Sequence, residues 1–200
     1  ASSSAVYGNL PLGADHKEKF SITSPYAQDK LTVEHYAKIA FEIYNTSSVG
    51  LRLFNVYGPG QKSNSPYSAV IPVFINRMLK KLPVIINGGY QTRDFVHVKD
   101  VVKCIVAALK LALNQRVCET VNVLTGRSVT VDELADLIAL LIDVSPKKVY
   151  QDLPVGDPEV SQGTANKMVE LLSVNLGEFA DMKNGLEATI QSIRDNESED

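Results

Sequence analysis

The feature that most constrains this chain is the alternation of short strand-like runs with longer helix-like stretches. Apolar residues recur at helical spacing in the longer stretches and cluster in the short ones, and turn residues separate the two kinds. This order is typical of an α/β protein and excludes a helical bundle or a β-sandwich. The predicted strands are 1–7, 49–56, 83–87, 94–98 and 120–124, and the predicted helices are 26–44, 69–82, 101–113, 164–172, 176–193 and one that follows Thr130.

Three of these helices carry further local signals. Thr130 and Glu133 have the spacing of a capping box, in which each side chain accepts a hydrogen bond from the other residue's backbone N–H. Pro72 requires that the helix over 69–82 begin close before it, because proline is tolerated only in a first turn. The helix over 26–44 has an apolar side, made by Val33, Tyr36, Ala37, Ala40, Phe41 and Tyr44.

Composition narrows the class of protein. Apolar residues make up 44% and charged residues 22% of the 200, which excludes a disordered chain. No apolar run is long enough to span a membrane, and a net charge of -3 argues against a nucleic-acid partner. With only Cys104 and Cys118, and no signal peptide at the start, a disulfide framework is not expected, and we expect a cytoplasmic protein. The three histidines are too dispersed for a zinc site, so no metal is predicted.

Tyr26 and Lys30 stand four residues apart at the start of a predicted helix, so their side chains share one face. An ammonium group close to a phenol favours the phenolate, and Lys30 should therefore lower the pKa of Tyr26 from about 10 and make it a usable acid or base. Taken alone, this pattern is more often an ordinary surface pair than a catalytic one. Ser2-Ser3-Ser4, at the end of the preceding predicted strand, could bring a hydroxyl beside Tyr26.

Four sequence blocks occur here in an order that resembles the extended short-chain dehydrogenase/reductase family. They resemble in particular its NAD-dependent nucleotide-sugar epimerases and dehydratases, and most of all the UDP-glucose and UDP-N-acetylglucosamine 4-epimerases. The similarity runs from residue 1 to about Gly126, and more loosely to about Leu172. The blocks are S-S-S-A-V-Y-G (2–8), S-P-Y-A-Q-D-K (24–30), L-R-L-F-N-V-Y-G-P-G-Q (51–61) and Q-T-R-D-F-V-H-V-K-D-V (91–101).

The resemblance implies a catalytic role for three residues and a cofactor, NAD. Tyr26 would be the acid/base, and Lys30 would hold the nicotinamide ribose and lower the pKa of Tyr26. Ser3 would be the catalytic serine. Tyr26, Lys30 and Phe54 would contact the cofactor, with Phe54 near the nicotinamide.

The resemblance also implies a binding site for a UDP-sugar. Ser4 would contact the sugar, and Asn55 and Arg93 would hold the phosphates, a task that suits a guanidinium. Ala69 and Val70, in a stretch similar to one that cradles uracil, would contact the base. Asp157 would lie at the nucleotide ribose. Arg127 is either a further phosphate ligand or a solvated charge, and Pro154 stands where the family usually has arginine.

Two positions bear on the reaction type. Family dehydratases carry acidic residues two and three positions before the tyrosine of the first block, and related decarboxylases carry a glutamate two before it. Here those positions are Ala5 and Ser4. The resemblance therefore implies epimerisation at carbon 4 of the sugar, with dehydration or decarboxylation as the alternative within the family.

The resemblance implies a fold of class α/β that comprises the C-terminal portion of a Rossmann-type doubly wound parallel sheet and a smaller α/β substrate domain. No Gly-rich turn precedes a helix in the way that a dinucleotide pyrophosphate requires, so the chain looks like part of a longer enzyme. The expected Rossmann segments are 1–62 and 95–124, the substrate segments are 63–94 and 125–194, and 195–200 is an acidic tail.

Two further expectations complete the sequence reading. Family members commonly pair through the helix that carries the catalytic tyrosine, so a homodimer through the Tyr26 helix is expected. From another class, a non-catalytic nucleotide-sugar-binding remnant would keep the substrate site without turnover. Intact Ser3, Tyr26 and Lys30 favour the enzyme, whereas the absent Gly-rich part and Pro154 favour the remnant.

Overall fold

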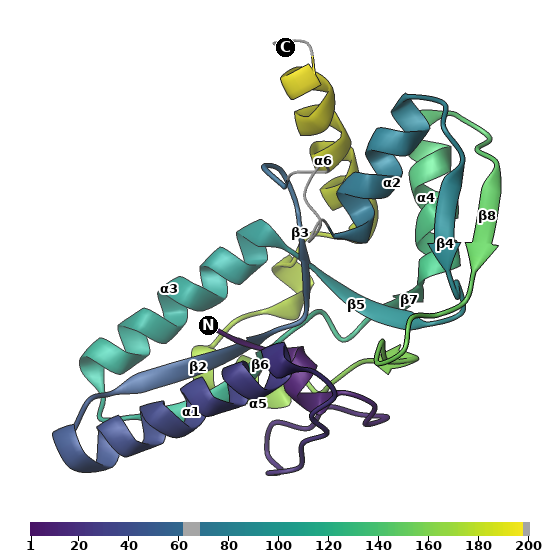
Figure 1. Ribbon diagram of the computed structural model, residues 1–200. Coiled ribbons are helices and arrows are strands. Elements are labelled where there is room, and N and C mark those ends of the chain that lie inside the picture. Colours follow the sequence, from purple (N-terminus) through teal and green to yellow (C-terminus); the bar gives the residue numbers. More distant parts are fainter. Residues whose placement is uncertain (62–68, 198–200) are drawn as a thin grey trace.

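The computed structural model describes residues 1–61 and 69–197 and is mixed α/β (Figure 1). Its first sheet has three parallel strands in the order β1 (Ser2–Ser3), β2 (Ser48–Leu53) and β6 (Cys118–Val123). Because the strands run in one direction, their carboxyl ends meet at the same edge of the sheet. In open parallel sheets this edge is where ligands bind.

Helices cover both faces of the first sheet. The helix α1 (Pro25–Tyr44) contacts all three strands, and α3 (Val98–Asn114) and α5 (Asn166–Leu172) pack on the other face. Alternation along the strands produces this division, since successive side chains point to opposite faces. The core between the sheet and the helices α3 and α5 is apolar. Its buried residues come from the strands and from both helices: Leu51, Val96, Val101, Cys104, Ala108, Val121, Val123, Met168 and Leu172.

The strand β5 (Thr92–His97) is the centre of a second sheet. It pairs in parallel with β3 (Asn55–Tyr57) and β9 (Val160–Ser161), and antiparallel with β7 (Ser128–Thr130). Since β3 follows β2 after a single residue, Phe54, this sheet continues directly from the first. The short step between the two sheets places strand ends of both close together.

Three helices and a strand pair enclose the largest core. The strands β4 (Val84–Asn87) and β8 (Lys148–Gln151) pair in parallel, and α2 (Val70–Leu79), α4 (Val131–Ile142) and α6 (Met182–Glu197) contact one another beside them (Figure 1). The buried residues of this core are Tyr57, Ile71, Phe74, Ile75, Met78, Val84, Ile86, Phe95, Val131, Leu134, Ala135, Ile138, Ala139, Ile142, Leu186, Ile190 and Ile193.

Two local predictions about helix starts are confirmed. The capping box is present in full: the backbone N–H of Glu133 donates to the Thr130 hydroxyl at 3.1 Å, and that of Thr130 donates to the Glu133 carboxylate at 2.8 Å. Pro72 lies in the first turn of α2. Both signals act within one turn of chain, which is why the sequence alone could predict them.

The N-terminal strand is shorter than predicted. Only Ser2 and Ser3 are extended, and Ser4–Tyr7 form a 3-10 turn, η1. The Ser3 hydroxyl accepts from the backbone N–H of Ala5 at 3.1 Å, and this cap ends the strand at Ser3. Likewise, the single strand predicted over 49–56 is divided into β2 and β3 at Phe54, where the chain passes from one sheet to the other.

The predicted helix over 176–193 is wrong in its first third. Residues Leu176–Glu178 form a separate 3-10 turn, η2, and α6 begins at Met182. The Asn175 side chain caps η2, and the Asp181 carboxylate accepts from the backbone N–H of Asn184 at 3.0 Å. Two caps six residues apart specify two elements, and apolar periodicity does not detect such a break.

The predicted apolar side of α1 does not face the core. Val33, Tyr36 and Tyr44 are 50%, 67% and 74% exposed, while the buried residues of the helix are Ala27, Leu31 and Glu34. A charged residue thus occupies the buried side, because Glu34 has a buried ionic partner in β2. No pattern of apolar residues could have predicted this orientation.

Sequence analysis also missed β7, β8 and β9, which have two to four residues each and obtain their partners from distant parts of the chain. The domain division remains a prediction. Met168 and Leu172, from the segment 125–194, pack in the core of the first sheet. Within residues 1–61 and 69–197, no helix is both long enough and apolar enough to cross a membrane.

Candidate active site

A cavity of about 290 Å3 opens at the carboxyl edge of the first sheet. The strands β1 and β2 end there, and η1, the step at Phe54 and the segment around β9 form its walls. Four of the predicted site residues line it beside the strand ends: Ser3, Ser4 and Phe54, predicted at the catalytic, sugar and cofactor sites, and Asn55, predicted at the phosphates. The parallel strands thus bring together sequence blocks that lie about fifty residues apart, as expected at such an edge.

A second cavity, of about 380 Å3, lies between α2 and β5. Ala69 and Val70, the residues proposed to contact the base, line it at the start of α2. The residues Asn64 to Ser68 precede them in the stretch that resembles a uracil-binding segment, and they lie outside the described residues. The apolar side chains of Phe74 and Phe95 also line this cavity, and they suit the flat face of a base.

Three residues line both cavities: Asn55, Arg93 and Asp157. The Arg93 guanidinium Nη2 donates to the Asp157 carboxylate Oδ1 at 3.2 Å, which joins β5 to the loop before β9. The Asn55 side-chain amide donates to the backbone oxygen of Asp94 at 3.1 Å. These residues form the boundary between a polar cavity and an apolar one, where a ligand extending through both would pass.

Burial changes the electrostatics of this boundary. Arg93 is 8% exposed, and burial lowers its pKa while the neighbouring Asp157 carboxylate opposes that change. The Asp157 side chain is 45% exposed, so the pair lies partly in solvent. The Asp157 carboxylate can therefore turn into the solvent. Arg93 can then bind a phosphate in its place.

The Tyr26 and Lys30 pair lies at the start of α1, where the Ser24 hydroxyl caps the helix by accepting from the backbone N–H of Ala27 at 3.1 Å. Lys30 Nζ is 5.6 Å from the centre of the Tyr26 ring and donates to the backbone oxygen of Ala1 at 3.2 Å. Tyr26 is 55% exposed, and neither residue lines the two cavities. The structure thus confirms that the two side chains meet, while their access to substrate stays a prediction.

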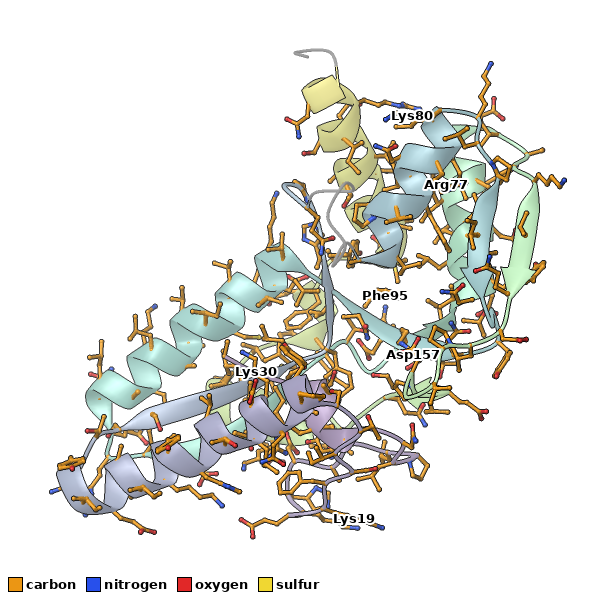
Figure 2. All side chains as sticks on the ribbon, in the orientation of Figure 1. Lys19, Lys30, Arg77, Lys80, Phe95 and Asp157 are labelled. Atoms are coloured by element: carbon orange, nitrogen blue, oxygen red, sulfur yellow. The ribbon has the colours of Figure 1, made fainter. Side chains whose placement is uncertain are left out.

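The helix α1 lies beside the elements that carry Ser3 and Ser4. Figure 2 labels Lys30 on α1, Phe95 on β5 and Asp157 in the loop before β9. The helix α1 also contacts β1 and η1 directly, so the element with Tyr26 abuts the one with Ser3. Both candidate catalytic elements therefore lie at one end of the first sheet.

Sequence reasoning missed several polar residues that line the cavities. Thr23, Ser161 and Gln162 line the first cavity, and Asn87 and Gln91 line the second. Gln91 stands inside the fourth sequence block, which was a usable signal. Ser161 and Gln162 offered none, because β9 has two residues and is formed only by pairing with β5.

Two buried residues with titratable side chains lie outside both cavities. His97 is 3% exposed, packs its ring 5.3 Å from that of Tyr57 and caps α3 by accepting from the backbone N–H of Lys99. Cys104 is buried among apolar residues, and burial raises the pKa of its thiol to about 11. Neither residue lines a cavity described above.

The residues present fit one end of a dinucleotide. A phenol and an ammonium group lie in contact on α1, and the Phe54 ring lines the polar cavity. Hydroxyl and ammonium groups suit the ribose of nicotinamide, and an aromatic edge suits its ring. This donor set fits the nicotinamide end of NAD, and the described residues hold no Gly-rich turn for the pyrophosphate.

Comparison with known proteins decides the family. Residues 1–123 match the NAD dependent epimerase/dehydratase family. The chain belongs to this family. Among curated proteins, it is similar to a putative UDP-glucose 4-epimerase of Methanocaldococcus jannaschii, with 38% identity over 154 residues, which are 75% of this chain and 48% of that protein. The chain spans about half the length of the curated relatives that it matches.

Solved structures of epimerases have the same fold. The UDP-N-acetylglucosamine 4-epimerase of Methanobrevibacter ruminantium, in complex with UDP-N-acetylmuramic acid, aligns with a TM-score of 0.87 at 34% identity. That alignment covers 98% of this chain and 62% of the other. The UDP-glucuronic acid 4-epimerase of Bacillus cereus, in complex with UDP-glucuronic acid and NAD, aligns with a TM-score of 0.86 at 27% identity, over 98% and 60%.

Proposed function

We propose that the full-length protein containing this chain is an NAD-dependent epimerase that inverts carbon 4 of a UDP-sugar. One observation carries the proposal: the polar cavity at Ser3 and the apolar cavity at Ala69 and Val70 share a boundary made by Asn55, Arg93 and Asp157. The parts of a nucleotide sugar follow the same order: a polar sugar for the polar cavity, an anionic diphosphate for the boundary with Arg93, and a flat base for the apolar cavity. The relatives named above support this ligand class.

Three residues carry the chemistry in this proposal. Tyr26 removes the proton from the sugar 4-hydroxyl, with the Lys30 ammonium 5.6 Å from the centre of its ring. Ser3 donates a hydrogen bond to the same oxygen. Tyr26, Lys30 and Phe54 hold the nicotinamide end of NAD, which when bound takes up a hydride from carbon 4 and returns it. Tyr26 then returns the proton to the inverted alcohol.

The remaining site residues bind the substrate in this proposal. Arg93 holds the diphosphate with Asn55 beside it, and Asp157 turns toward the nucleotide ribose when phosphate takes its place on Arg93. Ala69 and Val70 support the base from the start of α2, and Ser4 contacts the sugar. Each of these residues lines one or both cavities.

The lining of the polar cavity favours epimerisation over dehydration or decarboxylation. Of the described residues that line it, Asp157 alone is acidic, and its carboxylate pairs with Arg93. Ser4 and Ala5 line the cavity where a dehydratase needs carboxyl groups to eliminate water. Among the described residues of this cavity, no unpaired carboxyl group is present to serve as the acid for elimination.

Incubation of the full-length protein with NAD and UDP-glucose or UDP-N-acetylglucosamine in deuterated water tests the proposal. The expected product is the carbon-4 epimer, identified by NMR, without solvent deuterium on carbon. A 4-keto-6-deoxy sugar carrying deuterium would instead indicate a dehydratase, and carbon dioxide from UDP-glucuronic acid a decarboxylase. Tight binding of UDP without turnover of any sugar would indicate a non-catalytic binding protein and overturn the proposal.

We further propose that two copies pair through α1. The side chains of Val33, Tyr36, Ile39, Ile43 and Tyr44 are all 47–74% exposed on this one helix. Exposed apolar surface of this extent on one element is typical of an interface.

A further inference from the structure

A buried ion pair joins the helix of Tyr26 to the first sheet. Arg52 on β2 donates to Glu34 on α1 twice, from Nε to Oε1 at 2.8 Å and from Nη2 to Oε2 at 2.6 Å. Both side chains are 5% exposed. Burial favours the neutral form of Arg52, but the hydrogen bonds and charge of Glu34 outweigh this effect and raise the pKa of Arg52. The two side chains thus form a bidentate, buried pair between α1 and β2.

Hydrogen bonds extend the pair to three neighbouring elements. The Ser2 hydroxyl on β1 donates to Glu34 Oε1 at 2.5 Å. Arg52 Nη1 donates to the Tyr7 hydroxyl of η1 at 2.7 Å, and that hydroxyl donates to Asn122 Oδ1 on β6 at 2.7 Å. Every strand of the first sheet thus contributes one polar side chain to a network that lies on the α1 side.

The network contacts the proposed catalytic residues through their own elements. Tyr26, Lys30 and Glu34 follow one another at four-residue spacing, so they lie along one face of α1. Ser2 directly precedes Ser3 on β1. The hydrogen bond from Ser2 to Glu34 therefore connects the helix that carries Tyr26 to the strand that carries Ser3. It links the two elements through a pair of side chains, beside the hydrogen bond from Lys30 Nζ to the backbone oxygen of Ala1, and the ion pair with Arg52 holds the carboxylate in place to receive it.

We propose that Ser2 and Glu34, held by Arg52, are positioning residues that set the placement of Tyr26 and Lys30 relative to Ser3. The inference rests on the proposed function of those three residues. A buried ionic network is an expensive way to join a helix to a sheet, since apolar side chains of similar size often give equal stability. The network instead fixes an orientation. The hydrogen bonds of the Glu34 carboxylate allow only one rotation of α1 about its axis relative to β1, and apolar packing alone would not specify that rotation. A shift of about 1 Å in a reacting group can cost about a hundredfold in rate.

Ser2→Ala in the full-length protein isolates the link, because it removes one hydroxyl and leaves the ion pair intact. We expect kcat to fall about tenfold to a hundredfold, with KM for the nucleotide sugar within about twofold of the parent value. Ser2→Thr keeps the hydroxyl and should restore most of kcat. Ser48→Ala is the matched control, because Ser48 is a half-buried serine on the adjacent strand β2 and is not part of the network.

A second readout is independent of turnover. Amide hydrogen exchange in α1 should become faster in Ser2→Ala than in Ser48→Ala, because the helix loses the hydrogen bond that Ser2 donates to Glu34. Unchanged kcat, or unchanged exchange, in Ser2→Ala would overturn the inference. If the parent turns over no nucleotide sugar, the proposed function fails, and the exchange comparison still decides whether Ser2 holds α1 in place.

Discussion

At the scale of single residues, the site combines side chains held firmly with side chains left free to change partner. Arg93 is buried and directed by its strand, whereas Asp157, its partner, is nearly half exposed. Tyr26 is more than half exposed although it lies on a well-capped helix. Two predictions follow from this contrast between fixed and accessible groups.

Tyr26→Phe should abolish proton transfer while leaving the fold unchanged. The substitution removes only a hydroxyl from a side chain that is 55% exposed, so stability should change little. We expect kcat for epimerisation to fall by about 10²- to 10⁴-fold, the usual contribution of a general acid/base. Tyr36→Phe is the matched control on the same helix, and equal loss in both variants would contradict the role given to Tyr26.

Arg93→Lys should weaken substrate binding even though it keeps the positive charge. Lysine offers a point charge in place of a planar fork, so one of two charge-assisted hydrogen bonds to the diphosphate is lost. We expect the Kd for UDP to rise by about ten- to a hundredfold, measured by titration calorimetry, which corresponds to about 1.5–3 kcal/mol. Asp157→Asn, which frees Arg93 from its partner, should not weaken UDP binding to the same degree. If it does, the negative charge of Asp157 is itself required for UDP binding, beyond the hydrogen bond that an asparagine could still make with the ribose.

At the scale of elements, side-chain oxygens decide where helices begin. Ser3 caps η1, Ser24 caps α1 and Thr130 caps α4, and each accepts a hydrogen bond from a backbone N–H two or three residues ahead. Two of these caps orient the elements that carry the candidate catalytic residues. The third fixes the start of α4, whose buried side packs in the largest core.

Thr130→Ala removes the cap of α4 and the reciprocal contact with Glu133. We expect the free energy of unfolding to fall by about 0.5–2 kcal/mol, measured by urea denaturation. Thr32→Ala is the control, because the Thr32 hydroxyl donates to the backbone oxygen of Gln28 inside α1, where alanine is at least as favourable. A Thr130→Ala variant as stable as the control would mean that tertiary packing alone fixes the start of α4.

At the scale of the whole molecule, long-range contacts join the two sheets to the terminal helix. Tyr57 on β3 is 2% exposed, and its ring lies at right angles to that of Phe95 on β5. The same tyrosine lies directly against Gly185 of α6. The last helix is thereby attached to the strands that bound the apolar cavity, although more than a hundred residues separate Gly185 from Tyr57 in the sequence.

Gly185→Ala should destabilise the protein, contrary to the usual gain for alanine in a helix. A Cβ at this position would overlap the buried Tyr57 hydroxyl, and the ring has no exposed space into which to move. We expect a loss of about 1–3 kcal/mol by chemical denaturation, typical of an overfilled core. Glu187→Ala, two residues later on the exposed side of α6, should stay within about 0.5 kcal/mol of the parent.

Ile43→Glu should convert a dimer of the full-length protein into a monomer. Ile43 is 65% exposed on α1, and a charge there would have to be buried in the proposed interface. Light scattering should show the mass falling to half that of the parent. Leu140→Glu, at a 76% exposed position on α4, should leave the mass unchanged. A parent that is already monomeric would refute the pairing.

The sequence by itself determined features whose causes act within a few residues. The alternation of strands and helices, the capping box at Thr130, the helix start at Pro72 and the meeting of Tyr26 with Lys30 all depend on local geometry, and all are present. The four ordered blocks were sufficient to identify the family. These signals can be recognised without knowledge of the tertiary contacts, because backbone hydrogen bonding and side-chain spacing are properties of short segments.

Only the tertiary structure decided which surfaces meet. The buried side of α1 is set by the ion pair of Glu34 with Arg52, and not by the apolar side that periodicity indicated. The pairing of Arg93 with Asp157 connects residues 64 apart, and β9 exists only because β5 lies beside it. Such contacts form because charged side chains and backbone groups must find partners when they are buried. Which partners they find depends on how distant segments pack, and the sequence of a short segment does not contain that information.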